Sequence, residues 1–121
     1  HDALPICHSS LGAFPEYFAT SGSSTATPLI GGSTSLSPAV AVTQRNLSVR
    51  LSTAPGAGNI RSINVFDDGG FGLGCVMSGA QTTCQDTSSF SVTPGSNLVM
   101  FSSTGGSPAD TDIYFGFTLG P

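Results

Sequence analysis

Apolar and polar residues alternate with a period of two along most of the chain after Pro38. Residues 47–51 are in turn apolar, polar, apolar, polar and apolar, and residues 113–119 show the same kind of alternation over a longer segment. Successive side chains of a strand point to opposite faces, so this period indicates strands with one buried face. The apolar side of the last segment, which we expect to be buried, consists of Ile113, Phe115, Phe117 and Leu119.

Turn-forming residues interrupt the alternation at short intervals, as in residues 54–59, residues 67–70 and the pair Pro94-Gly95. Seven or eight short segments of this kind fit into 121 residues, and helix signals are nearly absent. The pattern therefore predicts an all-β fold, an antiparallel β-sandwich or jelly roll of about seven to eight strands.

Residues 1–37 are the least regular part of the chain. They contain one compact apolar patch at residues 14–18, followed by a stretch rich in Ser, Gly and Thr. We expect residues 1–37 to be an irregular N-terminal segment with a strand at a sheet edge or a strand exchanged with a neighbouring chain. Residues 38–121 then form the β-sandwich core of a single domain.

Charge is scarce, because only 8% of residues are charged, lysine is absent and the formal net charge is -4. Nucleic-acid binding needs clustered cations, so this composition excludes it. No apolar stretch reaches the roughly 18 residues of a membrane span. Sheet edges are normally protected by lysine, and large side chains stand on both faces of residues 97–103. These features predict a homo-oligomer, a trimer or a filament, with contacts through the outer faces of the strands near residues 97–103 and 111–119 and a contribution from residues 1–20.

The three cysteines lead to different expectations. If Gly79 and Ala80 form a two-residue hairpin turn, Cys75 faces Cys84 at a non-hydrogen-bonded position, which suits a disulfide. Such a bond places the protein outside the cytosol, and two buried free thiols are the plainer alternative. Cys7 is left over, as an intermolecular thiol or as a buried idle one.

Residues that could carry chemistry are few. His1 and His8 could bind copper if His1 is the mature N-terminus, and no G-x-S-x-G motif is present for a serine nucleophile. Asn46 begins an N-glycosylation sequon. The alternating glycines of residues 70–74 favour close approach of a backbone or a ring rather than phosphate binding.

Two acidic pairs are the candidate metal ligands, Asp67 with Asp68 and Asp110 with Asp112. Hard cations such as Ca²⁺ prefer several oxygen ligands, but neither pair belongs to a complete ligand loop. A solvated turn is therefore the plainer interpretation, and we expect no cofactor, with Ca²⁺ as the alternative.

Three segments carry a resemblance: residues 46–59 (NLSVRLSTAPGAGN), the segment from Cys75 to Cys84 with the following Asp86-Thr87, and residues 113–119 (IYFGFTL). Over residues 38–121 the chain resembles the C-terminal β-sandwich heads, of the C1q/TNF-like jelly-roll type, of bacterial and phage collagen-like or fibre surface proteins. The resemblance implies a trimeric jelly roll in an adhesive or coat role and supplies no catalytic residues.

The sequence therefore predicts a non-catalytic structural or adhesive head domain of an extracellular fibre or coat protein, self-associating at a cell or virion surface. A cell-surface glycan or host surface is the further partner considered. The alternatives are a filament or pilus subunit assembled by strand exchange through its N-terminal segment, and a secreted copper-binding protein using His1.

Overall fold

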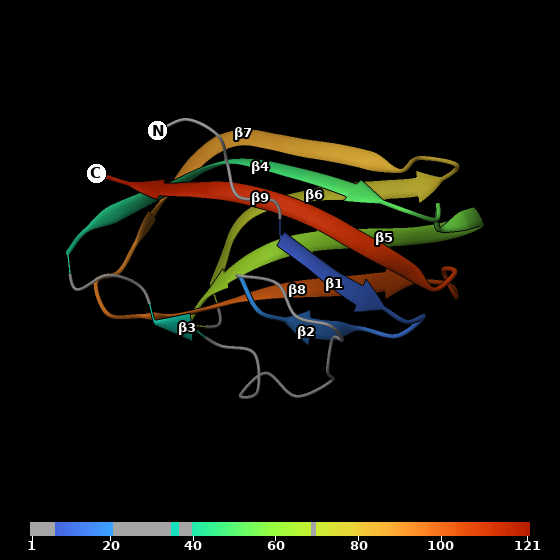
Figure 1. The fold of residues 1–121 in the computed structure, drawn as a ribbon, viewed down its shortest axis with the longest axis horizontal. Helices are drawn as coiled ribbons and strands as arrows, with labels where there is room; N and C mark the ends of the chain where they lie inside the picture. Colours follow the sequence, from blue (N-terminus) through green and yellow to red (C-terminus); the bar gives the residue numbers. More distant parts are fainter. Residues whose placement is uncertain (1–6, 21–34, 37–39, 69) are drawn as a thin grey trace.

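The computed structural model describes residues 7–20, 35–36, 40–68 and 70–121 (Figure 1). These residues form nine strands and no helix. The strands are β1 (Cys7–Leu11), β2 (Glu16–Phe18), β3 (Ser35–Leu36), β4 (Val42–Leu51), β5 (Gly56–Asp67), β6 (Gly70–Gly79), β7 (Thr83–Val92), β8 (Asn97–Gly105) and β9 (Thr111–Gly120).

The strands form two antiparallel sheets, one in the order β1-β9-β4-β7 and one in the order β2-β8-β5-β6, with β3 also paired to β8. The pairings are nested, because β5 pairs with β6, β4 with β7, β2 with β8 and β1 with β9. A long hairpin rolled up in this way is a jelly roll, which confirms the predicted fold class. Three short strands, β1, β2 and β3, lie in the segment of residues 1–37 that was expected to be irregular.

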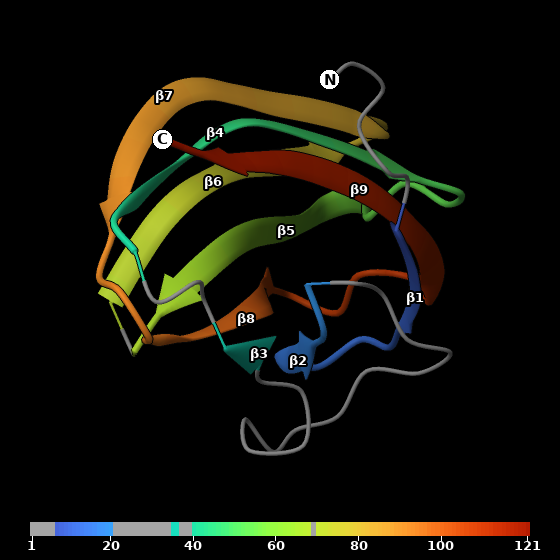
Figure 2. The ribbon, with the colours of Figure 1, turned by 60° about the vertical axis from the view of Figure 1, so that its left-hand side comes forward.

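The two sheets are stacked as layers, with β7, β4 and β9 over β6, β5 and β8 (Figure 2). The inward positions of both sheets supply the main core, and the side chains at its centre are fully buried. This core contains Leu11, Phe18, Leu47, Val49, Leu51, Ile63, Val65, Leu73, Met77, Met100, Ile113 and Phe115. A second, smaller cluster contains Val42, Val92 and Leu98.

A bulge in β4 keeps the apolar residues of this strand on one face. Gln44 and Leu47 both point inward although they are three positions apart, which in a regular strand would place them on opposite faces. The register shifts between Arg45 and Leu47. Asn46 takes up the extra residue with a φ of 57°, a left-handed conformation that asparagine tolerates better than most residues.

The end of β9 is less buried than its alternation predicts. Phe115 is 2% exposed as expected, but Phe117 is half-buried and Leu119 is 39% exposed. The reason lies in the pairing of β1, which covers β9 only from Thr111 to Phe115. Beyond that point β9 lacks a neighbour on this side within the described residues, so its inward side chains meet solvent.

The N-terminal strands close one side of the sandwich, because β1 belongs to one sheet and β2 to the other. Buried Arg61 of β5 holds their connection, donating to the carbonyl oxygens of Gly12 at 2.9 Å and Ala109 at 3.1 Å. Burial lowers the pKa of Arg61, and the negative charges of Glu16 and Asp110 oppose this effect. The described part of the N-terminal segment thus pairs within its own chain.

Candidate functional site

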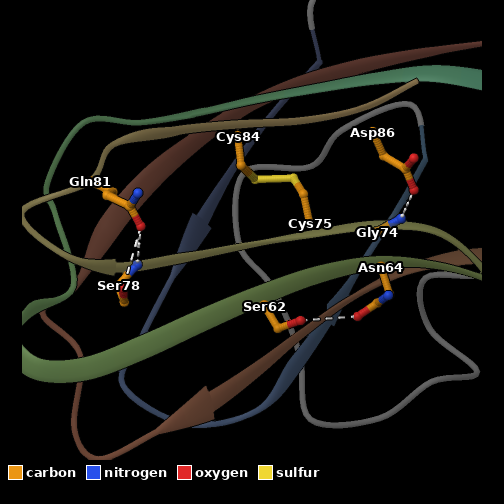
Figure 3. Close-up of a disulfide and its surroundings, with 8 residues drawn as sticks. All are labelled: Ser62, Asn64, Gly74, Cys75, Ser78, Gln81, Cys84 and Asp86. Atoms are coloured by element: carbon orange, nitrogen blue, oxygen red, sulfur yellow. Dashed lines mark hydrogen bonds between the residues drawn. A yellow bond between two sulfur atoms is a disulfide. The ribbon is translucent and has the colours of Figure 1, made fainter. Parts of the chain in front are cut away.

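The disulfide between Cys75 and Cys84 is present, with the two Cα atoms 5.8 Å apart, which confirms the predicted pairing (Figure 3). Its position differs from the expectation. Cys75 is paired with Ile63 in the five-stranded sheet, and Cys84 is paired with Val49 in the four-stranded sheet. The bond therefore joins the two layers at their edges.

The hairpin register from which the disulfide was predicted is wrong. A tight turn does form, with the Gln81 N–H donating to the Ser78 carbonyl oxygen at 3.1 Å and Gly79 at a φ of 59°. After this turn, however, β6 continues along β5 while β7 continues along β4. Each strand finds a ladder partner in a different sheet, so only the turn itself matches a hairpin.

Side chains from the opposite sheet cover the backbone edge of β6. The Leu73 N–H donates to Gln44 Oε1 at 3.0 Å. The Gly74 N–H donates to Asp86 Oδ2 at 3.0 Å, as Figure 3 shows. The bond from Gly74 contributes most to lowering the pKa of Asp86, and hydrogen bonds from Ser88 lower it further. Together with the disulfide, they protect the edge without lysine, so the absence of lysine does not leave this edge open.

An aromatic row crosses the outer face of the five-stranded sheet, and we call this surface the aromatic face. Tyr17 of β2 lies 4.8 Å from Phe101 of β8, and Phe101 lies 5.1 Å from Phe66 of β5, measured between ring centroids. Phe66 in turn meets Phe71 of β6 edge-on at 4.6 Å. Four strands thus contribute one ring each, and Phe71 is 64% exposed.

The rest of the aromatic face is apolar or neutral. Ile60 is 44% exposed and Val76 is 55% exposed, and both lie on this side of the sheet. Asn64 lies beside them, where its Oδ1 accepts a hydrogen bond from the Ser62 hydroxyl at 3.3 Å (Figure 3). Among the described residues, the outward positions of β2, β8, β5 and β6 carry no charged side chain.

The outer face of the four-stranded sheet, which we call the polar face, has the opposite character. Arg45 and Arg50 are exposed there, and the Arg50 guanidinium lies 4.5 Å above the Tyr114 ring. Asn46, the predicted glycosylation residue, is exposed at the β4 bulge. The backbone at position 46 is left-handed, which explains the presence of an asparagine there independently of glycosylation.

The two acidic pairs lie at opposite ends of β5 and β8. Asp67 Oδ2 accepts from the Thr93 N–H at 3.3 Å, and Asp68 Oδ1 accepts from the Asn97 N–H at 3.0 Å. These contacts hold the turn before β8. In the part of the chain that the structure describes, no three His, Cys, Asp or Glu side chains gather to hold a metal ion.

Asp110 and Asp112 instead border an open pocket of about 470 Å³ beside the N-terminal strands. Its other lining residues are Ser10, Leu11, Gly12, Glu16, Ser52, Thr53 and Thr111. Several of these groups are already engaged, since the Ser10 hydroxyl donates to Asp112 Oδ1 at 2.9 Å and the Gly12 N–H donates to Glu16 Oε1 at 2.5 Å. The pocket therefore belongs to the region where the connection from β1 to β2 closes one side of the sandwich.

Cys7 is half-buried in β1 and packs against the core as a free cysteine. Burial raises the pKa of its thiol, which makes it a poorer nucleophile. Cys7 lies opposite Phe115, and the row continues through Val49 to Cys84. Three strand spacings of about 4.8 Å separate the thiol from the disulfide, too far for direct exchange. An intermolecular bond of Cys7 stays a prediction.

The candidate copper ligands fall largely outside the described part of the chain. His1 lies outside the described residues. Only the backbone of His8 is described, and it is paired with Tyr114 in the four-stranded sheet. Copper binding therefore stays a prediction.

Comparisons with known proteins identify no relative of this chain. No protein-family model, no curated protein and no solved structure matches this chain. The resemblance to C1q/TNF-like fibre heads therefore stays a prediction. No helix in the described residues is long and apolar enough to cross a membrane.

Sequence reasoning located the aromatic face only in part. The alternation of residues 97–103 indicated large side chains on both sides of one strand, Phe101 among them. It did not group Phe101 with Tyr17, Phe66 and Phe71, because that requires the order and register of four strands. Phe71 also lies after a register shift between Asn64 and Phe66, which alternation alone does not place.

Proposed function

We propose that this protein is a non-catalytic adhesive and structural domain that works outside the cytosol and makes its contacts through the aromatic face. The observation that carries the proposal is that exposed apolar side chains, Ile60, Phe71 and Val76 among them, lie on that one face. Exposed apolar patches of this kind are typical of interaction surfaces.

Two further observations support the same role. The Cys75–Cys84 disulfide fits an oxidising environment such as the extracellular space. The resemblance to heads of fibre and surface proteins fits a domain that is displayed for contact, either as a trimeric head or in another assembly. The edge of β6 is covered by side chains, which favours association through a face over association through this edge.

Adhesion of coated beads tests the proposal. Beads that carry the protein should be retained on a surface coated with the same protein or with a neutral polysaccharide such as dextran or mannan. The double variant Phe71→Ser/Val76→Ser should lose most of this retention, because it replaces two exposed apolar side chains of the aromatic face. Both positions are exposed, so the fold should be kept.

Phe90→Ser is the matched control, since Phe90 is 40% exposed on β7, outside the aromatic face. Retention of this variant should equal that of the wild type. If the double variant is retained as well as the control on every surface, the aromatic face is not the contact surface and the proposal fails. Long polymers in electron micrographs would favour the filament subunit assembled by strand exchange.

A further inference from the structure

We infer that the occupant of the aromatic face is the same face of a second copy of this chain, related by a two-fold axis. This inference rests on the proposed function, because it names the partner of the same surface. In a two-fold contact the same patch of both copies meets itself, so a patch without charged side chains forms such a contact without enclosing any charge.

The distribution of charge selects the aromatic face for such a contact. Its outward positions on the described strands carry serine, asparagine, glycine and apolar residues but no charged side chain. The polar face exposes Arg45 and Arg50, and a contact of that face with itself would take these charges out of water. Of the two outer faces described, the aromatic face is therefore the one that can pair with itself without enclosing a charged side chain.

The geometry of the rings favours a protein partner over a sugar. Sugar rings stack on the open faces of aromatic side chains. Phe66 and Phe101, however, lie 5.1 Å apart and within 24° of parallel, so their faces are turned toward each other. Tyr17 continues this stack on Phe101 at 4.8 Å and 32°. Three of the four rings thus have a face occupied by a neighbouring ring, whereas Phe71 meets Phe66 at 74°. Most of the row therefore suits packing against other apolar side chains.

Exposed aliphatic side chains extend the same surface along the sheet. On neighbouring strands, Val76 lies two rows and Ile60 three rows from the ring of Phe71. The neutral Ser62 and Asn64 lie between Ile60 and Phe66. A spread of apolar groups over several strands requires a broad partner of matching character, which a second copy of this face supplies.

Sedimentation velocity at about 10 mM ionic strength tests the inference. Charges act over roughly 30 Å at this ionic strength, so charges introduced on the aromatic face should affect the dimer wherever the two-fold axis lies on that face. The wild type should form a dimer of twice the 12.1 kDa chain mass. Ile60→Lys/Val76→Lys and Ile60→Glu/Val76→Glu should each dimerise about tenfold more weakly or worse. An equimolar mixture of the two variants should restore the dimer.

The control pair, Ser48→Lys and Ser48→Glu on the polar face, should dimerise as the wild type does. A monomeric wild type, or two charged variants whose mixture fails to dimerise, overturns the inference. If the bead assay still depends on Phe71 and Val76 in that case, the aromatic face remains the contact surface and its partner is a different one, such as a neutral glycan. If the charged variants dimerise as well as the wild type, the inference fails, and the bead assay alone then decides the proposed function.

Discussion

Two glycines in β6 show how single positions determine what can lie against this strand. A Cβ atom at Gly72 would collide with the Gln44 side chain, and one at Gly74 would collide with the Asn64 side chain. The alternating glycines thus admit two amide side chains, where a backbone or a ring was expected. One of these amides bonds the β6 edge, and the other forms part of the aromatic face.

Two phenylalanines of β9 should differ strongly in their contribution to stability. Phe115→Ala should lower the free energy of unfolding by about 3–5 kcal/mol, as loss of a buried ring does. Phe117→Ala should cost less than about half of that, because its ring is already half-exposed. Denaturant unfolding of both variants measures this difference, and equal losses would mean that Phe117 is as buried as the alternation alone predicts.

The elements at the two open sides of the sandwich are closed by different means. On one side the chain itself crosses between the sheets, from β1 to β2, and Arg61 holds the crossing from inside. On the other side β6 is joined to β7 by the disulfide and by the Gly74 N–H, which donates to Asp86. The Leu73 N–H, which donates to Gln44, joins β6 to β4. A sheet edge in this fold is therefore protected by cross-sheet contacts of neutral and acidic side chains.

Removing the disulfide should weaken the closure between β6 and β7. The bond spans a sequence separation of nine residues, so loss of its loop-closing effect should cost roughly 2.5–3 kcal/mol. Denaturant unfolding of Cys75→Ala/Cys84→Ala should show this loss, and a reductant should lower wild-type stability to a similar degree. Cys7→Ala should keep the sensitivity to reductant; if it does not, Cys7 rather than this bond is responsible.

The Asp86 bridge between the same two strands should make stability depend on pH. Its N–H donors at Gly74 and Ser88 favour the charged carboxylate, so the pKa of Asp86 is lower in the folded than in the unfolded protein. Its stabilisation is complete above the ordinary aspartate value of about 3.9 and is lost as the pH falls through the lower folded value.

Melting temperatures of the wild type and Asp86→Asn between pH 7 and pH 2 measure this effect. The variant should melt lower at neutral pH, and its melting temperature should fall less steeply below about pH 4. Parallel curves over the whole range would show that Asp86 does not carry this dependence.

For the whole molecule, the alternation of apolar and polar residues was sufficient to predict a jelly roll. It was not sufficient to predict which side chains meet across neighbouring strands and between the two sheets. The apolar positions of β4, β5 and β9 were readable because each strand has one buried face. The aromatic face and the cross-sheet position of the disulfide depend on strand order and on register shifts, which alternation does not contain. Cys75 and Cys84 were paired correctly because their turn is local, although the ladder assumed beyond the turn is absent from the described strands.

The nested pairing of the strands also determines when the protein can fold during its synthesis. The hydrogen bond from Ser10 to Asp112 joins residues 102 positions apart, whereas β5 and β6 are neighbours in sequence. At about 5–20 residues per second, the first strands wait several seconds or more for β9 to be made. Throughout that time Leu11 and Phe18, which are buried in the core of the folded protein, are exposed on the growing chain. The order of synthesis thus makes the N-terminal strands the last to be enclosed and the part that a chaperone can bind for longest.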